Sequence, residues 1–151
     1  MNRIEVLKRS DMFRELDDKH LAMVGEMGTD QVFDAGIIIY KQGSTADLIY
    51  VIEEGLVGII LEVGPLAQRQ VQAAANFESF GWSAMIPPYS RTATVKALEQ
   101  TKVIAFDGRE LTAFCTAHGG ESFKIMQALA RVIAERLRQA YIQLLGVTDG
   151  H

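Results

Sequence analysis

Apolar residues change their spacing twice along this chain, and the changes divide it into a helical start, a strand-rich middle and a helical end. Residues 4–28 carry apolar side chains at steps of three and four, the period of a helix with one buried face. Ser10 and Asp17 are suitable caps where one short helix gives way to the next. The pattern therefore predicts N-terminal helices within residues 1–30.

Between residues 31 and 107 the apolar residues occur in short runs that are separated by turn residues, glycine above all. Runs rich in Ile, Val and Tyr with glycine between them are typical of antiparallel strands. They cover residues 31–34, 37–40, 48–53, 56–63, 68–75, 93–98 and 102–107. These seven runs bring the predicted strand number to about eight, the number at which a small barrel closes around a side-chain core or one ligand. The middle of the chain is therefore predicted to be a β-barrel.

The last third of the chain, residues 108–146, predicts two helices. Asp107 and Glu110 form a capping box, and Gly119-Gly120 is expected to end the first helix. Residues 121–145 then predict one long helix with a coiled-coil seam at four-then-three spacing. The seam residues are Met126, Ala130, Ile133, Leu137, Ala140 and Leu144. We predict a homodimer through this seam, and the alternative is that both apolar flanks of the helix cover the barrel.

Composition predicts one domain over residues 1–151 with an ordinary hydrophobic core. Apolar residues make up 48%, and the net charge of −4 argues against direct nucleic-acid binding, which needs clustered Lys and Arg. The single cysteine, Cys115, excludes an internal disulfide and suits a reducing cytoplasm. We find no apolar run of the roughly 18 residues that a membrane helix needs, and no secretory signal core. A cytoplasmic protein with no membrane contact is expected.

Catalytic and metal-binding patterns are missing from the sequence. His20, His118 and His151 do not stand at the spacing that places two metal ligands on one helix face or strand. We identify no nucleophile elbow, Walker sequence or Cys-x-x-Cys pair. We therefore expect no enzyme activity, no metal and no cofactor, and a metal-dependent barrel enzyme remains the weakest of three functional hypotheses.

The most specific stretch is residues 80–95. Gly81 permits a sharp turn, and the next residues have room for about one helical turn before Pro87 stops it. Free amides at the start of a helix accept anions, and the guanidinium of Arg91 offers a planar fork of donors that matches a phosphate. Thr92 adds a hydroxyl. The stretch is either an anion pocket or a surface turn with an exposed arginine.

The order Phe80-Gly81, short apolar turn, then Pro-Pro-Tyr-Ser-Arg-Thr-Ala-Thr-Val resembles the phosphate-binding cassette of cyclic nucleotide-binding domains. These domains occur in the catabolite activator family, in the regulatory subunit of the cyclic-AMP-dependent kinase and in cyclic-nucleotide-gated channels. Gly36, Gly43 and Gly55 also fall where the family places glycines. The resemblance implies a double-stranded β-helix, or jelly-roll barrel, flanked by helices. It also implies cyclic AMP or cyclic GMP as a possible effector.

The resemblance assigns residues to parts of a ligand. For the phosphate it implies Gly81, the amides of Ser83 and Ala84, Arg91 and Thr92. Trp82 stands where the family has a glutamate that holds the ribose hydroxyl. The indole either plugs the pocket, with Arg91 as a structural ion-pair partner, or stacks on a base, with Tyr89 as a second ring. Glu78 is a further candidate for the missing carboxylate.

These observations lead to a functional hypothesis. We expect a stand-alone regulatory module that binds a phosphate-bearing small molecule and signals through its last helix to an unidentified effector protein. In the catabolite activator family that helix leads into a DNA-binding domain. Here the chain closes at residues 146–151, so we expect no DNA-reading element. The alternative is an interaction or scaffold protein that keeps the fold without a ligand.

Overall fold

Two short helices begin the chain. The structure, a computed structural model, describes residues 1–146, so the end of the predicted domain, including His151, lies outside the described residues. Helix α1 spans Arg3–Arg9 and α2 spans Asp18–Met27. Both predicted caps are confirmed. Ser10 is the C-cap of α1, and the Asp17 carboxylate accepts the His20 N–H at 2.9 Å as the N-cap of α2.

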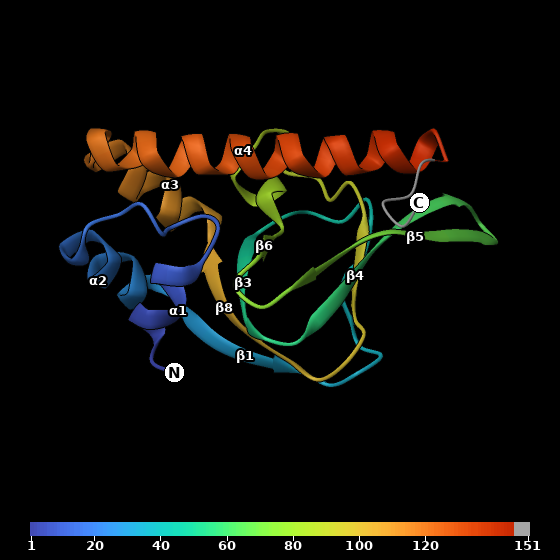
Figure 1. Cartoon of the computed structure of the whole chain (residues 1–151), viewed down its shortest axis with the longest axis horizontal. Helices are drawn as coiled ribbons and strands as arrows, with labels where there is room; N and C mark the ends of the chain where they lie inside the picture. The colour runs from blue at the N-terminus through green and yellow to red at the C-terminus, as the bar shows by residue number, and fades with distance from the viewer. Residues whose placement is uncertain (147–151) are drawn as a thin grey trace.

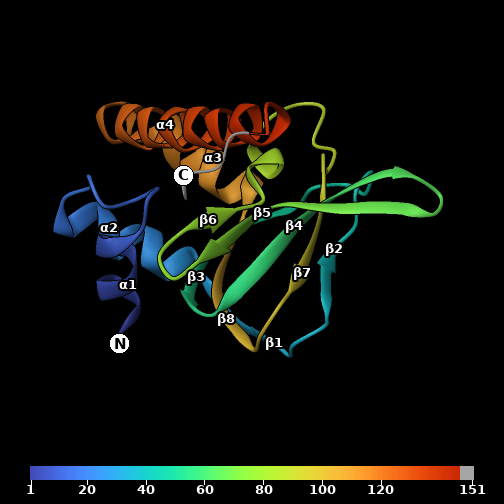
Figure 2. The ribbon, with the colours of Figure 1, turned by 45° about the vertical axis from the view of Figure 1, so that its right-hand side comes forward.

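Eight strands follow and pair antiparallel in two sheets of four (Figures 1 and 2). They are β1 (Thr29–Phe33), β2 (Ile38–Tyr40), β3 (Leu48–Glu54), β4 (Leu56–Gly64), β5 (Ala67–Ala75), β6 (Ser79–Phe80), β7 (Thr94–Ala97) and β8 (Thr101–Asp107). One sheet has the order β1-β8-β3-β6 and the other β2-β7-β4-β5. The predicted strand number and jelly-roll class are confirmed, and the described pairings give two facing sheets instead of one closed ring.

The core between the sheets mixes aromatic and aliphatic side chains. Tyr50 and Phe80 of the first sheet stack with ring centroids 4.8 Å apart. They belong to one buried cluster with Val57, Ala74 and Val95 of the second sheet. A separate buried cluster packs the outer face of β3 and β8 against α1, α2 and the C-terminal helices.

Two helices complete the fold. Helix α3 spans Gly108–Ala117 and α4 spans Gly119–Leu144. Asp107 caps α3 as predicted, accepting the N–H groups of Arg109 and Glu110 at 2.8 and 3.2 Å. The predicted stop at Gly119-Gly120 is wrong. The chain breaks at His118, whose φ of −130° and ψ of 71° are not helical, and both glycines begin α4.

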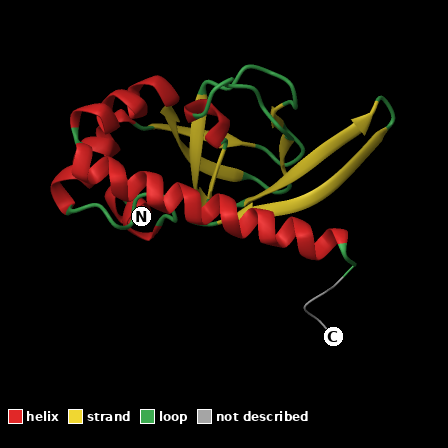
Figure 3. Ribbon diagram, turned by 90° about the horizontal axis from the view of Figure 1, so that it is seen from above, coloured by secondary structure: helices red, strands yellow, loops and turns green. Residues whose placement is uncertain are grey.

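Helix α4 lies across one end of both sheets and reaches toward the long β4–β5 hairpin (Figures 1 and 3). It is 26 residues long, and Ile125, Ala128, Leu129 and Arg136 are its buried residues. Charged side chains recur along it, and within residues 1–146 no helix has the length and apolarity that a membrane crossing requires. Its C-terminal half stands over the segment that contains residues 80–95.

Candidate functional site

A cavity of about 820 Å³ lies between the β4–β5 hairpin, residues 80–95 and the C-terminal half of α4. Its walls are mostly apolar. The apolar side chains come from both sides, among them Ile59, Leu61, Val71, Val95, Ile133, Leu137 and Leu144. A space of this size and character accepts a small organic molecule, provided that the few polar groups on its wall match the ligand.

The turn at Gly81 shapes one end of this cavity. Gly81 has a φ of 88° and precedes a single 3-10 turn, η1 (Trp82–Met85), which ends before Pro87 as predicted. A Cβ at this position would lie 3.0 Å from Nη1 of Arg91 and 3.1 Å from the carbonyl oxygen of Leu48. Glycine is therefore required both for the backbone angle and for the close approach of Arg91.

Arg91 points into the protein, and its side chain is held in place. The residue is 5% exposed, so the interpretation of residues 80–95 as a surface turn with an exposed arginine is wrong. Nη1 donates to the carbonyl of Gly81 at 2.9 Å and Nη2 to that of Leu48 at 2.7 Å. The guanidinium carbon lies 3.8 Å from the ring centroid of Tyr40. Nε is buried without a hydrogen-bond partner, and burial lowers the pKa of the guanidinium.

The structure brings together most, but not all, of the residues expected to bind a ligand. Besides Arg91, the cavity wall includes Gly81, Trp82, Ser83 and Thr92. Ala84 and Tyr89 do not line it. The N–H of Ala84 donates to the carbonyl of Gly81 at 3.2 Å, and the residue is packed beneath the turn. Tyr89 is 46% exposed and has a positive φ of 58°.

Trp82 lines the cavity without closing it. Its indole Nε1 donates to the hydroxyl of Ser79 at 3.2 Å, and the ring packs against the cluster beneath the helices. The cavity volume remains beside the ring. Glu78 points elsewhere, because its carboxylate accepts the N–H of Ala75 at 3.0 Å and does not line the cavity.

Arg136 of α4 is a site residue that the sequence analysis missed. It is 8% exposed, and its guanidinium carbon lies 5.0 Å from the ring centroid of Trp82. Nη2 donates to the carbonyl of Ser79 at 3.0 Å, whereas Nη1 is buried without a hydrogen-bond partner. The sequence contained a signal for this residue. Arg136 occupies the next position of the apolar flank formed by Leu129 and Val132, and a charged side chain at such a position is unusual.

The cavity is strongly positive although the chain is acidic overall. Its described lining contains Arg69, Arg91 and Arg136 and no Asp or Glu, in a chain whose net charge is −4. Burial raises the pKa of Tyr40 to about 12, while Arg91 and Arg136 both act to lower it. Both guanidiniums therefore act electrostatically on the same phenol. Positive charge within low-dielectric walls favours an anion.

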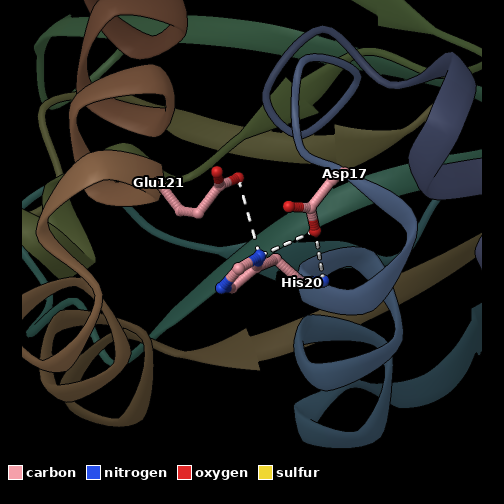
Figure 4. Close-up of side chains that lie close together, drawn as sticks. All are labelled: Asp17, His20 and Glu121. Atoms are coloured by element: carbon pink, nitrogen blue, oxygen red, sulfur yellow. Dashed lines mark hydrogen bonds and ion pairs between the residues drawn. The ribbon is translucent and has the colours of Figure 1, made fainter.

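A second cluster connects α2 to the first turn of α4 (Figure 4). Nδ1 of His20 lies 2.7 Å from Oδ1 of Asp17 and 3.9 Å from Oε2 of Glu121. Hydrogen bonds from the His20 amide and ring lower the pKa of Asp17. One nitrogen and two carboxylate oxygens are a donor set that a divalent metal accepts. The Asp17–His20 hydrogen bonds also explain the cluster as a helix cap that contacts α4.

A two-sheet jelly roll with a cavity between its turn segment and its last helix offers a candidate site for a small molecule. The chain matches the family model of the cyclic nucleotide-binding domain over residues 30–118. It therefore belongs to the cyclic nucleotide-binding domain family, which is a binding family and not a catalytic one. This confirms the resemblance that the sequence showed in residues 80–95.

Three similar proteins illustrate the match. The cAMP-dependent protein kinase regulatory subunit of Dictyostelium discoideum is 31% identical over 69% of this chain and 32% of its own length. The N-terminal domain of a Streptomyces coelicolor transcriptional regulator has a TM-score of 0.72 and 26% identity, covering 97% of this chain and 99% of that one. The Thermus thermophilus catabolite activator protein has a TM-score of 0.75 and 21% identity, covering 89% and 62%.

The chain spans about a third of the length of the first curated relatives it matches, 34% and 32%. The shared region is therefore the binding domain of longer proteins. By name, the kinase subunit and the Streptomyces protein are regulators.

Proposed function

We propose that this chain is a ligand-sensing regulatory module that binds a cyclic nucleotide or a related phosphate-bearing small molecule. The observation that carries the proposal is Arg91, which is buried on the wall of an apolar cavity with an unpartnered Nε. Burying a cation without a carboxylate partner is costly, and a bound anion offsets that cost. Family membership makes a nucleotide phosphate the natural anion.

The proposal assigns the phosphate to one end of the cavity. Its ligands there are Gly81, Ser83, Arg91 and Thr92, and the base or sugar lies toward Trp82, whereas the expected contacts from Ala84 and Tyr89 are left out because neither residue lines the cavity. Among the cyclic nucleotides, cyclic AMP is the first candidate, because a relative is named for its dependence on that nucleotide. Cyclic GMP is the second. The negative net charge favours a module with no direct nucleic-acid contact, and the single cysteine favours a cytoplasmic location.

The output of the module is proposed to pass through α4 to a separate effector protein. Ile133, Leu137, Ala140 and Leu144 line the cavity, so a ligand contacts this helix directly. A ligand that contacts the barrel and the helix together favours one arrangement of the two over any other. The change in helix position is then available to the effector.

Calorimetric titration with cyclic AMP, cyclic GMP and adenosine 5′-monophosphate tests the proposed function. We expect a one-to-one complex with at least one of them, and we expect Arg91→Lys to weaken it about tenfold or more because lysine lacks the planar fork. Arg131→Gln is the control, since Arg131 is exposed on α4 away from the cavity.

The scaffold alternative has its own support, because Arg91 already donates to two backbone carbonyls and so stabilises the fold without a ligand. The absence of measurable binding by all three nucleotides would favour that alternative and reject the proposed function.

A homodimer through α4 is part of the same proposal. Met126 is 40% exposed and Ala130 is exposed, and neither lines the cavity, whereas the other four seam residues do. Sedimentation velocity is expected to show twice the 16.7 kDa chain mass. Met126→Glu should convert the dimer to a monomer while ligand affinity changes less than about twofold. A monomeric wild-type protein at micromolar concentration would reject the dimer.

A further inference from the structure

The guanidinium of Arg136 is the second buried cation on the cavity wall, and its charge is poorly compensated. Its side chain is 9% exposed, and its one ion-pair contact among the described residues is with Glu78 at 4.0 Å, a side chain that is nearly half exposed. Nη1 has no hydrogen-bond partner. Arg136 lines the cavity, and a buried guanidinium with an unused donor there favours a ligand that supplies an acceptor.

A carboxylate that could accept from a ribose hydroxyl is missing from the same place. Trp82 can only donate a hydrogen bond, and it already donates to Ser79. The described lining of the cavity has no carboxylate. The polar groups there are three guanidiniums together with hydroxyls, amides and backbone groups. This donor-rich wall fits a ligand that brings acceptors and negative charge.

We propose that Arg136 is a second anion anchor, and that the cavity is built for a phosphate monoester on an apolar or aromatic body instead of a cyclic phosphodiester. This inference rests on the proposed function of the cavity and specifies its ligand class. A phosphate monoester carries a charge of about −1.5 to −2 at neutral pH. A cyclic phosphodiester has one terminal oxygen fewer and carries a charge of about −1. Two buried guanidiniums match the former more closely.

Contacts around Arg136 connect the proposed anchor to the rest of the fold. The carbonyl of Arg136 accepts a hydrogen bond from the Gln72 side chain of β5 at 2.6 Å, and its Nη2 reaches the Ser79 carbonyl of β6. Arg91 belongs to residues 80–95, which form another part of the cavity wall. A phosphate held by both arginines therefore links α4 to the barrel, which is the contact that a signal through α4 needs.

A matched ligand series tests this inference. Adenosine, cyclic AMP and adenosine 5′-monophosphate share one body and differ in charge and in the number of terminal phosphate oxygens. With wild-type protein we expect adenosine 5′-monophosphate to bind at least about tenfold more tightly than cyclic AMP, and adenosine to bind least. The measurement is isothermal titration calorimetry at pH 7.5, where the monoester is largely the dianion.

Variants of Arg136 separate direct contact from a structural role. Arg136→Gln should weaken adenosine 5′-monophosphate about tenfold or more and cyclic AMP about threefold or less, so the preference falls at least about threefold. Arg136→Lys keeps the charge and should retain an intermediate preference. Arg131→Gln on the same helix should leave both affinities unchanged. Circular dichroism and thermal unfolding establish that each variant is folded. If Arg136→Gln does not fold, Arg136→Lys provides the test.

The outcomes separate this inference from the proposed function. Cyclic AMP binding more tightly than the monoester, or Arg136 variants that weaken both ligands equally, would reject the second anchor and leave the proposed function standing. No binding by any phosphate ligand would reject both. A monoester preference that Arg136→Gln and Arg136→Lys leave unchanged would also reject the inference, because the preference would then come from other residues.

Discussion

Arg91→Ala is expected to lower the free energy of unfolding by about 2–4 kcal/mol, in addition to removing the phosphate contact. The guanidinium donates to the carbonyls of Gly81 and Leu48, which lose their partner in the variant. The Tyr40 ring also loses a cation that lies 3.8 Å from its centroid. Truncation leaves a cavity as well, because the arginine is 5% exposed.

Urea denaturation followed by circular dichroism measures this change without any ligand. Thr92→Val is the matched control, since Thr92 is the exposed neighbour on the same cavity wall and should change stability by less than about 0.5 kcal/mol. If Arg91→Ala unfolds at the same urea concentration as the wild type, the guanidinium is not a structural residue, and its burial serves the ligand alone.

The part of the site that the sequence predicted is local. Gly81, Pro87 and Arg91 stand within a few residues of one another, and each acts through a backbone angle, a helix stop or a charge that sequence alone reveals. The turn at Gly81 and the stop before Pro87 were therefore predicted correctly. The predicted strands follow the same logic, because each needs only its own run of β-formers between turn residues.

The parts that were missed depend on contacts between distant residues. Strand β6 has two residues, too few for any periodic pattern, and it exists because Phe80 pairs with Tyr50 of β3. His20 and Glu121 come from different helices, so their proximity is set by the packing of α4 against α2. The helix start at Gly119 was also missed, since Gly119 and Gly120 are locally poor helix formers yet begin α4.

Trp82→Glu is expected to reverse the ligand preference of the cavity. The substitution places a carboxylate beside Arg136, whose guanidinium carbon lies 5.0 Å from the present indole ring. A carboxylate accepts hydrogen bonds from ribose hydroxyls, and it also neutralises the unpartnered guanidinium. We expect cyclic AMP affinity to rise about tenfold and adenosine 5′-monophosphate affinity to fall by a similar factor, as measured by calorimetry.

Trp82→Phe is the control for this reversal, because it keeps an aromatic ring against Arg136 and removes only the hydrogen bond to Ser79. It should leave the order of the two ligands unchanged. The double variant Trp82→Glu with Arg136→Gln then isolates the two effects. If the new carboxylate acts by accepting ribose hydroxyls, the gain in cyclic AMP affinity survives the loss of Arg136. If it acts by neutralising the guanidinium, the gain disappears, and charge balance at Arg136 is what sets ligand choice.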